Sequence, residues 1–143
     1  MSDRLLVVRV GTQRLGLPMT AVVEVTAPGG IQKVPGHSPA LRGVIEARGR
    51  LVSLFHLGAL LAGGTPPAAV SDTVVLAQVD GRWAALEVDE ADAAPTGALL
   101  PDDGHPGLAA WASGAVRDQR GWIPVLNLGL LAERWGRGKE GAA

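Results

Sequence analysis

The sequence contains no cysteine and no tyrosine, and phenylalanine occurs only once. Without cysteine the chain has no disulfide framework, no thiolate metal site and no cysteine nucleophile, a composition that fits a reducing compartment. The shortage of aromatic side chains leaves few platforms on which nucleic-acid bases could stack. The 13 basic and 14 acidic residues give a formal net charge of -1, so the basic excess typical of nucleic-acid-binding domains is also missing.

No apolar run reaches the roughly 18–20 residues that a membrane span requires. The N-terminal residues 1–4 lead directly into a short apolar segment and lack the basic region and long hydrophobic stretch of a secretory signal. We therefore expect a cytoplasmic protein without direct insertion into a membrane. The length of 143 residues predicts a single domain, because domains average roughly 100–200 residues.

Turn-forming residues are abundant, with 20 glycines and 10 prolines. They separate short Val- and Leu-rich segments, a pattern typical of all-β sandwiches and barrels. Asp80-Gly81 is a strong hairpin signal, because an Asp-Gly pair suits a two-residue turn with positive φ. We predict strands at 4–10, 14–17, 31–34, 41–47, 50–55, 73–79, 82–88, 111–116 and 122–126, a strand or tight turn at 21–25, a short helix or turn at 56–61 and a terminal helix at 128–135.

The second half of the chain repeats the first at an offset of roughly 70 residues, outside the period of a solenoid. The opening segments LLVVRVGTQRLGLP and VVLAQVDGRWAALE correspond, and so do SLFHLG and PVLNLG. We therefore expect two similar β units, at about 4–62 and 72–135, with a linker near 63–71 and a frayed tail at 136–143. Because about 70 residues provide little core for an independent domain, the two units are expected to share one core.

No set of residues forms a credible catalytic or metal constellation. The three histidines, His37, His56 and His105, lie far apart in the sequence, without metal-ligand spacing. The acidic run at 89–92 is typical of a solvated segment or a helix cap rather than of a catalytic carboxylate pair. Ser53 lies in an apolar strand and lacks the surroundings of a nucleophile elbow. We expect no catalytic activity, no metal and no cofactor, which leaves binding to another protein.

The segment VPGHSPALRGVIEARGRLVSLFHL, residues 34–57, resembles the signature of CheW-like scaffold domains. The upstream VVEV segment, the GLP segment before it and the closing hairpin and helix also resemble this family, from about residue 4 to residue 135. The resemblance implies an all-β fold of two small SH3-like five-stranded barrels packed on a shared core, with short helical turns and a C-terminal helix. It also implies a non-catalytic adaptor that links the cytoplasmic tips of chemoreceptors to the regulatory domain of a CheA-type histidine kinase.

Five residues match family positions that contact a partner: Val22, Glu24, Gly43, Arg48 and Val74. The planar guanidinium of Arg48 suits bidentate pairing with a partner carboxylate. Each residue also has a structural interpretation. Val22 and Val74 fit core packing, Gly43 a bend in a strand, Glu24 a solvated strand position and Arg48 a turn that caps local carbonyls.

The chain departs from the family pattern close to this expected surface. The family's Asn, Pro and Asp are replaced here by Glu46, Ser53 and His56, and the second repeat has Asn127 where Asp is usual. Glu46 could pair with Arg48 or repel an acidic partner, and His56 introduces a titratable group. These changes leave open a divergent module that binds one partner, or a different one, in motility or polarity signalling. A further alternative is an enzyme or small-ligand protein built on small barrels.

Overall fold

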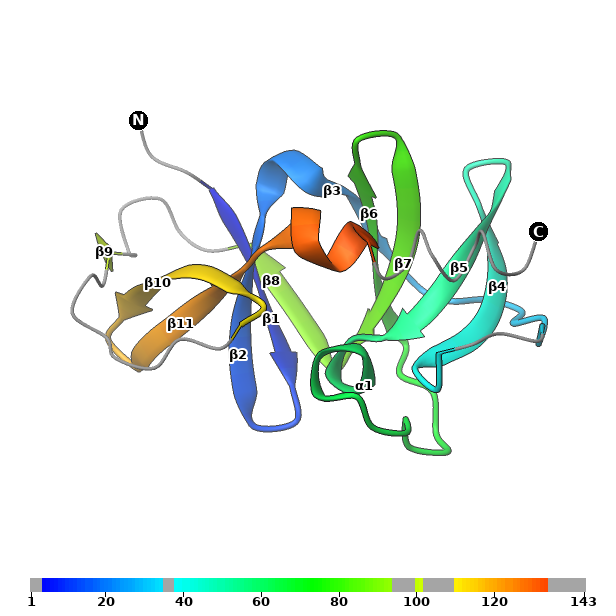
Figure 1. Ribbon diagram of the computed structural model, residues 1–143, viewed down its shortest axis with the longest axis horizontal. Coiled ribbons are helices and arrows are strands. Elements are labelled where there is room, and N and C mark those ends of the chain that lie inside the picture. The colour runs from blue at the N-terminus through cyan, green and yellow to red at the C-terminus, as the bar shows by residue number, and fades with distance from the viewer. Residues whose placement is uncertain (1–3, 35–37, 94–99, 102–109, 134–143) are drawn as a thin grey trace.

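The computed structural model describes residues 4–34, 38–93, 100–101 and 110–133, which form two β-sheets side by side along the long axis (Figure 1). Sheet A has six strands in the order β8-β1-β2-β11-β10-β9, and sheet B has five in the order β3-β6-β7-β5-β4. Sheet A consists of β1 (Leu5–Val10), β2 (Gln13–Pro18), β8 (Glu90–Ala93), β9 (Leu100–Pro101), β10 (Ala112–Asp118) and β11 (Gly121–Leu126). Sheet B consists of β3 (Val22–Thr26), β4 (Leu41–Ala47), β5 (Arg50–His56), β6 (Thr73–Val79) and β7 (Arg82–Val88).

Helical structure is confined to short segments among the described residues. A 3-10 turn, η1 (Met19–Ala21), joins β2 to β3, and helix α1 (Leu57–Ala62) follows β5. Residues 128–133 are helical, so the predicted terminal helix begins as expected within the described chain. The predicted tail at 136–143 lies outside the described residues.

The all-β prediction is confirmed, with three differences in detail. Sheet A has a sixth strand because the two-residue β9 pairs with β10. The strand expected at 31–34 is reduced to a single bridge between Gln32 and Val44. The polar segment 90–93 forms β8, because its backbone pairs with β1 while the side chains of Glu90 and Asp92 face solvent. Neither sheet closes on itself, and in sheet B Ile31 packs against the core near the open edge.

Two hairpins turn through pairs of residues with positive φ. Asp80 and Gly81 have φ values of 52° and 78°, as the Asp-Gly signal predicts. Arg48 and Gly49 form the corresponding turn between β4 and β5, with φ values of 53° and 76°. Gly tolerates this region, whereas the Cβ of Arg48 makes it unfavourable. Arg48 is therefore not a residue that turn geometry alone would select.

The internal repeat is visible in the structure, but the two halves exchange hairpins. Sheet A combines the β1–β2 hairpin with β10–β11, and sheet B combines β6–β7 with β4–β5. Equivalent parallel contacts join the hairpins, Gly16 opposite Val125 in sheet A and Ala85 opposite Leu54 in sheet B. Strands β3 and β8 cross over to pair with β6 and β1, respectively. The expected halves 4–62 and 72–135 therefore do not coincide with the two sheets, because each half supplies part of both.

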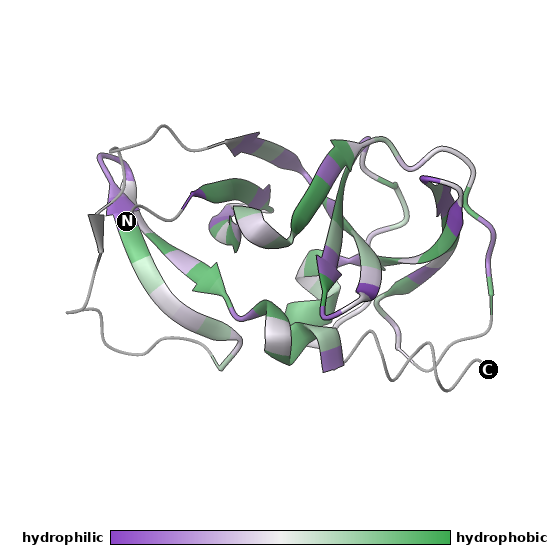
Figure 2. Ribbon diagram, turned by 90° about the horizontal axis from the view of Figure 1, so that it is seen from above, coloured by the Kyte–Doolittle hydropathy of each residue, from purple (hydrophilic) through white to green (hydrophobic). Residues whose placement is uncertain are grey.

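The exchange places one large core between the two sheets. This core is lined by Leu6, Val8, Leu15 and Leu17 from sheet A, and by Val75, Ala77, Phe55 and Leu86 from sheet B. A second, smaller cluster lies inside sheet B, formed by Ile45, Val52, Leu54, Val74, Leu76 and Ala85. Figure 2 shows long hydrophobic stretches on the central strands and hydrophilic residues at several hairpin turns. The shared core is the packing that the repeat predicts.

One buried ion pair holds the connection between α1 and β6 on sheet B. Glu87, 2% exposed, accepts hydrogen bonds from Arg42 Nε at 2.5 Å and from the backbone N–H of Ser71 at 2.8 Å. Arg42 Nη2 also donates to the carbonyl of Ala69 at 3.1 Å. Because every charged group here has a partner, the pair is compatible with burial and ties residues 69–71 to the sheet.

A second ion pair joins the β10–β11 hairpin to β2. Arg14 donates to both carboxylate oxygens of Asp118, at 2.7 and 2.9 Å, and the backbone N–H of Arg120 donates to the same carboxylate. The hydrogen bonds from Arg14 lower the pKa of Asp118 to about 2. The bidentate geometry fixes the orientation of this hairpin relative to its neighbour.

This low pKa predicts a loss of stability in acid. The stabilisation is fully present above the carboxyl's unfolded pKa of about 3.9 and is lost as the pH falls through the folded pKa of about 2. We expect a decrease of about 1–2 kcal/mol in the free energy of unfolding from this group. Urea unfolding over that pH range measures it, with Asp118→Asn as the comparison. An equally steep acid dependence in Asp118→Asn would contradict the assignment.

Candidate functional site

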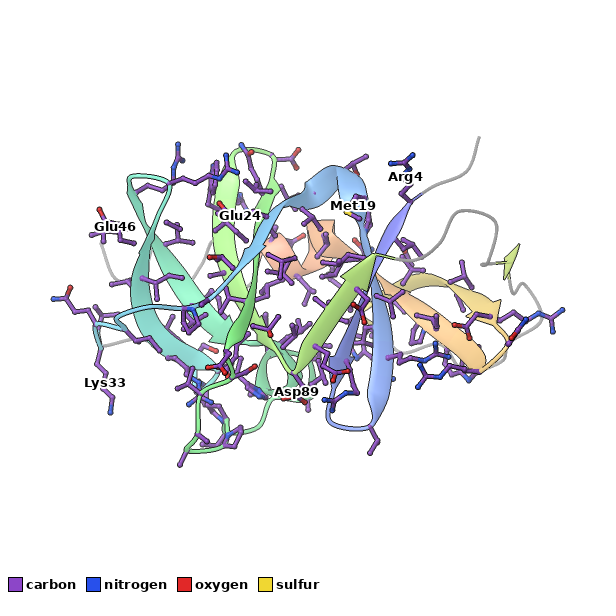
Figure 3. All side chains as sticks on the ribbon, turned by 180° about the vertical axis from the view of Figure 1, so that it is seen from behind. Arg4, Met19, Glu24, Lys33, Glu46 and Asp89 are labelled. Carbon is purple, nitrogen blue, oxygen red and sulfur yellow. The ribbon has the colours of Figure 1, made fainter. Side chains whose placement is uncertain are left out.

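Two of the expected contact residues, Glu24 and Arg48, meet at one end of sheet B. Arg48 lies in the β4–β5 turn and its Nε donates to Glu24 Oε1 on β3 at 2.6 Å. Their side chains remain 54% and 36% exposed, so both are accessible to a partner. Arg48 therefore pairs with Glu24 and not with Glu46, the internal pairing that the sequence allowed. Figure 3 shows Glu24 and Glu46 toward the end of the sheet where the hairpins turn.

A cation-π contact flanks this ion pair and was not anticipated from the sequence. The guanidinium carbon of Arg50 lies 4.1 Å from the centroid of the Trp83 ring. Trp83, Val23 and Ala47 are partly buried and pack against the cluster inside sheet B. Arg50 and Trp83 lie on different hairpins, so only the parallel pairing of β5 with β7 could reveal the contact. Trp83, Val23 and Ala47 therefore provide apolar packing beside the charged residues at this end of sheet B.

The two expected valines have different environments. Val22, at the start of β3, is partly buried and packs against the core between the sheets. Val74 is fully buried, at 0% exposure, in the cluster inside sheet B. Val74 is therefore a core residue, which is the structural interpretation that the sequence allowed for both valines. Of the two, only Val22 lies at the surface.

Gly43 occupies a buried bend in β4. The pairing of β4 with β5 shifts register between Leu41 and Gly43, and Gly43 has φ of 150°. A Cβ at this position would lie 2.3 Å from the carbonyl oxygen of Gln32. That carbonyl accepts a hydrogen bond from Val44 N–H at 2.8 Å, and Gln32 N–H donates back to Val44 at 2.9 Å. The structural interpretation of Gly43 thus has a direct physical cause.

An open groove of about 410 Å³ adjoins Val22. Thr20 and Ala21, immediately before β3, form one wall, and Gln78 and Val79 at the end of β6 contribute to its lining. Leu126 and Leu128 close it on the side of sheet A. This groove could not be predicted from the sequence, because its lining comes from four separated segments. Val22 and Glu24 follow the groove residues Thr20 and Ala21 along the chain, and we call the groove, Val22 and the Glu24–Arg48 pair together the β3 surface.

The CheW-like domain family matches residues 4–134. The chain belongs to the CheW-like domain family. In fold it is similar to the crystal structure of the scaffolding protein TtCheW from Thermoanaerobacter tengcongensis, with a TM-score of 0.75 and 20% identity over 92% of each chain. No curated protein matches the chain in sequence. The CheW-like fold expected from the resemblance is therefore confirmed, with the two sheets described above.

The substitution of the family's Asp by His56 has a local explanation in this CheW-like domain. His56 is the N-cap of α1, and its Nδ1 accepts a hydrogen bond from the Ala59 N–H at 3.0 Å. In the second repeat Asn127 Oδ1 accepts from the Leu130 N–H at 3.1 Å in the same way. Asp, Asn and a neutral His can all accept this bond, so the two departures preserve a cap. Ser53 is partly buried, opposite Val44 in the β4–β5 pair.

The cap predicts the effect of replacing His56. His56→Ala leaves the Ala59 N–H without its acceptor and is expected to lower the free energy of unfolding by about 1 kcal/mol. His56→Asn, which copies the cap of the second repeat, is expected to retain most of that stability. Urea denaturation at neutral pH compares the three proteins. A loss in His56→Asn as large as that in His56→Ala would show that capping is not the role of this side chain.

The acidic run and the histidines show no catalytic grouping in the described structure. Asp89 accepts a hydrogen bond from the Gly11 N–H at 2.6 Å, and Glu90 pairs with Arg9 at 3.3 Å, so both tie β8 to the β1–β2 hairpin. Within the described ranges, no three His, Asp or Glu side chains are grouped to hold a metal ion. His37 and His105 lie outside the described residues. None of the helices described here is long and apolar enough to cross a membrane.

Proposed function

We propose that this CheW-like domain is a non-catalytic adaptor between the cytoplasmic tip of a chemoreceptor and the regulatory domain of a CheA-type histidine kinase. Family membership over residues 4–134 supports the adaptor role. The β3 surface is the observation that supports the assignment of a binding site, because it combines an open groove of mixed lining with an accessible ion pair. In this proposal the protein is cytoplasmic, requires no cofactor and is recruited to receptor arrays through its partners.

The β3 surface suits an amphipathic helix, the form expected for a receptor tip. A helix can place an apolar ridge in a groove of this kind while its polar flank reaches the rim. Arg48 is exposed and can share its guanidinium between Glu24 and a partner carboxylate, since it has several donors in one plane. Val22 follows the groove residue Ala21 in the chain and is only partly buried, so it is a further contact residue of the proposed site. The kinase would then bind a separate face, and the adaptor would fix the geometry between the two.

Glu46 supports an alternative in which the domain has lost or changed one partner. Its side chain is exposed, and it forms no ion pair with any other described residue. A family Asn at this position carries no charge, so an acidic partner surface that suits the family would be repelled here. A module that binds a single partner in motility or polarity signalling would fit this difference. His56 does not add to this alternative, because its role in the structure is to cap α1.

Binding assays with purified components distinguish the two functions. The chain is titrated separately with the regulatory domain of the CheA-type kinase and with a soluble receptor tip from the same genome, by isothermal titration calorimetry. Binding to both supports the two-partner adaptor, and binding to one supports the alternative. Binding to neither by a folded chain would overturn the proposed function. Lys33→Glu, an exposed charge reversal away from the β3 surface, serves as the control and should bind as the wild type does.

A further inference from the structure

Helix α1 is held by a hydrogen bond at each end, and both bonds meet at Ala59. The Ala59 N–H donates to His56 Nδ1 at 3.0 Å, and the Ala59 carbonyl accepts from the Gly63 N–H at 2.8 Å. The helix has only six residues, and helices this short are marginal without such support. Loss of the bond to His56 therefore affects the whole helix and not only its first turn.

The imidazole of His56 lies over the first turn of α1 and is still within reach of solvent. A Cβ placed on Gly58 would lie 3.0 Å from Cε1 of the ring, so the ring packs closely on this turn. The same Cβ would lie 2.7 Å from a methyl carbon of Val10 on β1, so the turn also lies directly against sheet A. His56 is only half-buried. A ring that loses its hydrogen bond can therefore turn toward water.

The cap at this position depends on the charge of the imidazole. A neutral imidazole has one acceptor nitrogen, whereas the protonated ring carries a donor on both nitrogens. A protonated His56 would present an N–H group to the Ala59 N–H, and the cap would be lost. Histidine is the side chain whose charge ordinarily changes between about pH 5 and 8. The amide of Asn127, which caps the second repeat, keeps its acceptor over this range.

The charged groups around α1 leave the proton on His56 without a free carboxylate. Glu87 lies opposite His56 in the register of β5 with β7. The helix itself contains no charged residue, and the residue that leads into β6, Asp72, is exposed. Arg50 and Arg82 lie at the opposite ends of β5 and β7. The remaining charged residues of the neighbouring elements are held in ion pairs, Arg42 with Glu87 and Arg9 with Asp89 and Glu90.

We propose that His56 makes the start of α1 an acid-sensitive switch, in which protonation of the ring removes the N-cap and loosens the helix. Leu57, Ala59 and Leu60 are buried in the core between the sheets, so a looser α1 also loosens the packing at this end of the core. Figure 1 shows α1 beside the end of β1, where the two sheets meet. The switch goes beyond the adaptor function and requires neither partner.

The response is expected to be confined to α1 and the residues that follow it. Arg42 donates to the Ala69 carbonyl, and Glu87 accepts from the Ser71 N–H, where the chain returns to sheet B. These contacts do not involve His56, so they limit the responding segment to about residues 57–68. The cap made by Asn127 adjoins the groove of the β3 surface. The groove is therefore expected to keep its shape over the same pH range.

NMR spectroscopy of the full chain between pH 7.5 and 5.0 tests the switch. We expect the ring signals of His56 and the amide signals of Ala59 and Gly63 to titrate together. The hydrogen-exchange protection of the Ala59 N–H, corrected for the intrinsic exchange rate, is expected to fall by about three- to fivefold, the value of one N-cap. Asp118 titrates well below this range, so its effect on stability is separate.

The two repeats provide matched variants. His56→Asn copies the cap of the second repeat, and its Ala59 amide should no longer respond to pH. Asn127→His makes the reciprocal change, and its Leu130 amide should gain the response. His37 and His105 are the same in every protein, so their titration is a common background.

Two results would overturn the proposal. One is a wild type whose Ala59 amide stays unchanged while the ring of His56 titrates. The other is an Ala59 amide that responds as strongly in His56→Asn as in the wild type. Both comparisons use chains that retain a cap at neutral pH, so they remain decisive even if Asn127→His fails to fold.

Discussion

Arg48→Glu is expected to abolish binding through the β3 surface while the chain remains folded. The substitution places a carboxylate next to Glu24, so this end of sheet B becomes acidic and repels the partner carboxylate that Arg48 would bind. The effect on folding should be small, because an exposed ion pair contributes only about 0–1 kcal/mol. Calorimetric titration with the partner measures the binding, and thermal unfolding followed by circular dichroism measures the fold.

Arg48→Asn separates the role of the side chain in binding from its role in the turn. Asn tolerates positive φ better than Arg, so this variant should be as stable as the wild type or more stable by up to about 1 kcal/mol. It nevertheless removes the guanidinium and is expected to lose most of the affinity. Wild-type affinity in Arg48→Asn would show that the charge of Arg48 is not used. A stable variant without affinity would explain why an unfavourable Arg occupies this turn.

Much of the fold could be predicted because its determinants are local. Asp80-Gly81 specifies its turn by backbone chemistry, and short Val-rich segments between turns specify strands. The internal repeat also predicts that the two halves of the chain contain equivalent hairpins. It contains no information about which hairpin packs beside which, since β2–β11 and β5–β7 are contacts between halves of the chain. The exchange of hairpins therefore became visible only in the structure.

The candidate site shows the same limit at the level of single residues. Val22 and Val74 are alike in sequence context, yet Val22 is only partly buried and Val74 is in the core, because the register of β3 against β6 determines which face is buried. Arg48 and Glu24 are 24 residues apart in the sequence. Their pairing requires that the two edge strands of sheet B, β3 and β4, approach each other. By contrast, the cap made by His56 is local, and its repeat partner Asn127 already offered a clue to its role.

Gly43→Ala is expected to destabilise the fold strongly, although the family resemblance places Gly43 at a partner contact. The new Cβ would lie 2.3 Å from the Gln32 carbonyl oxygen, which is backbone and cannot rotate away. The φ of 150° is also one that residues with a Cβ rarely adopt. Relief of the clash would break the two hydrogen bonds between Gln32 and Val44. We expect a loss of about 3 kcal/mol or more in the free energy of unfolding, measured by urea denaturation.

Gly114 provides a matched control for this prediction. It lies 71 positions after Gly43, at the same register shift of the equivalent hairpin, where β10 pairs with β11. A Cβ at Gly114 would meet nothing within 4 Å, so Gly114→Ala should be neutral or slightly stabilising. If Gly43→Ala were as stable as Gly114→Ala but failed to bind a partner, Gly43 would be a contact residue. If Gly43→Ala instead lost stability and binding in parallel, Gly43 would be needed because it lets Gln32 approach β4. The loss of partner binding would then be an indirect effect of the loss of stability.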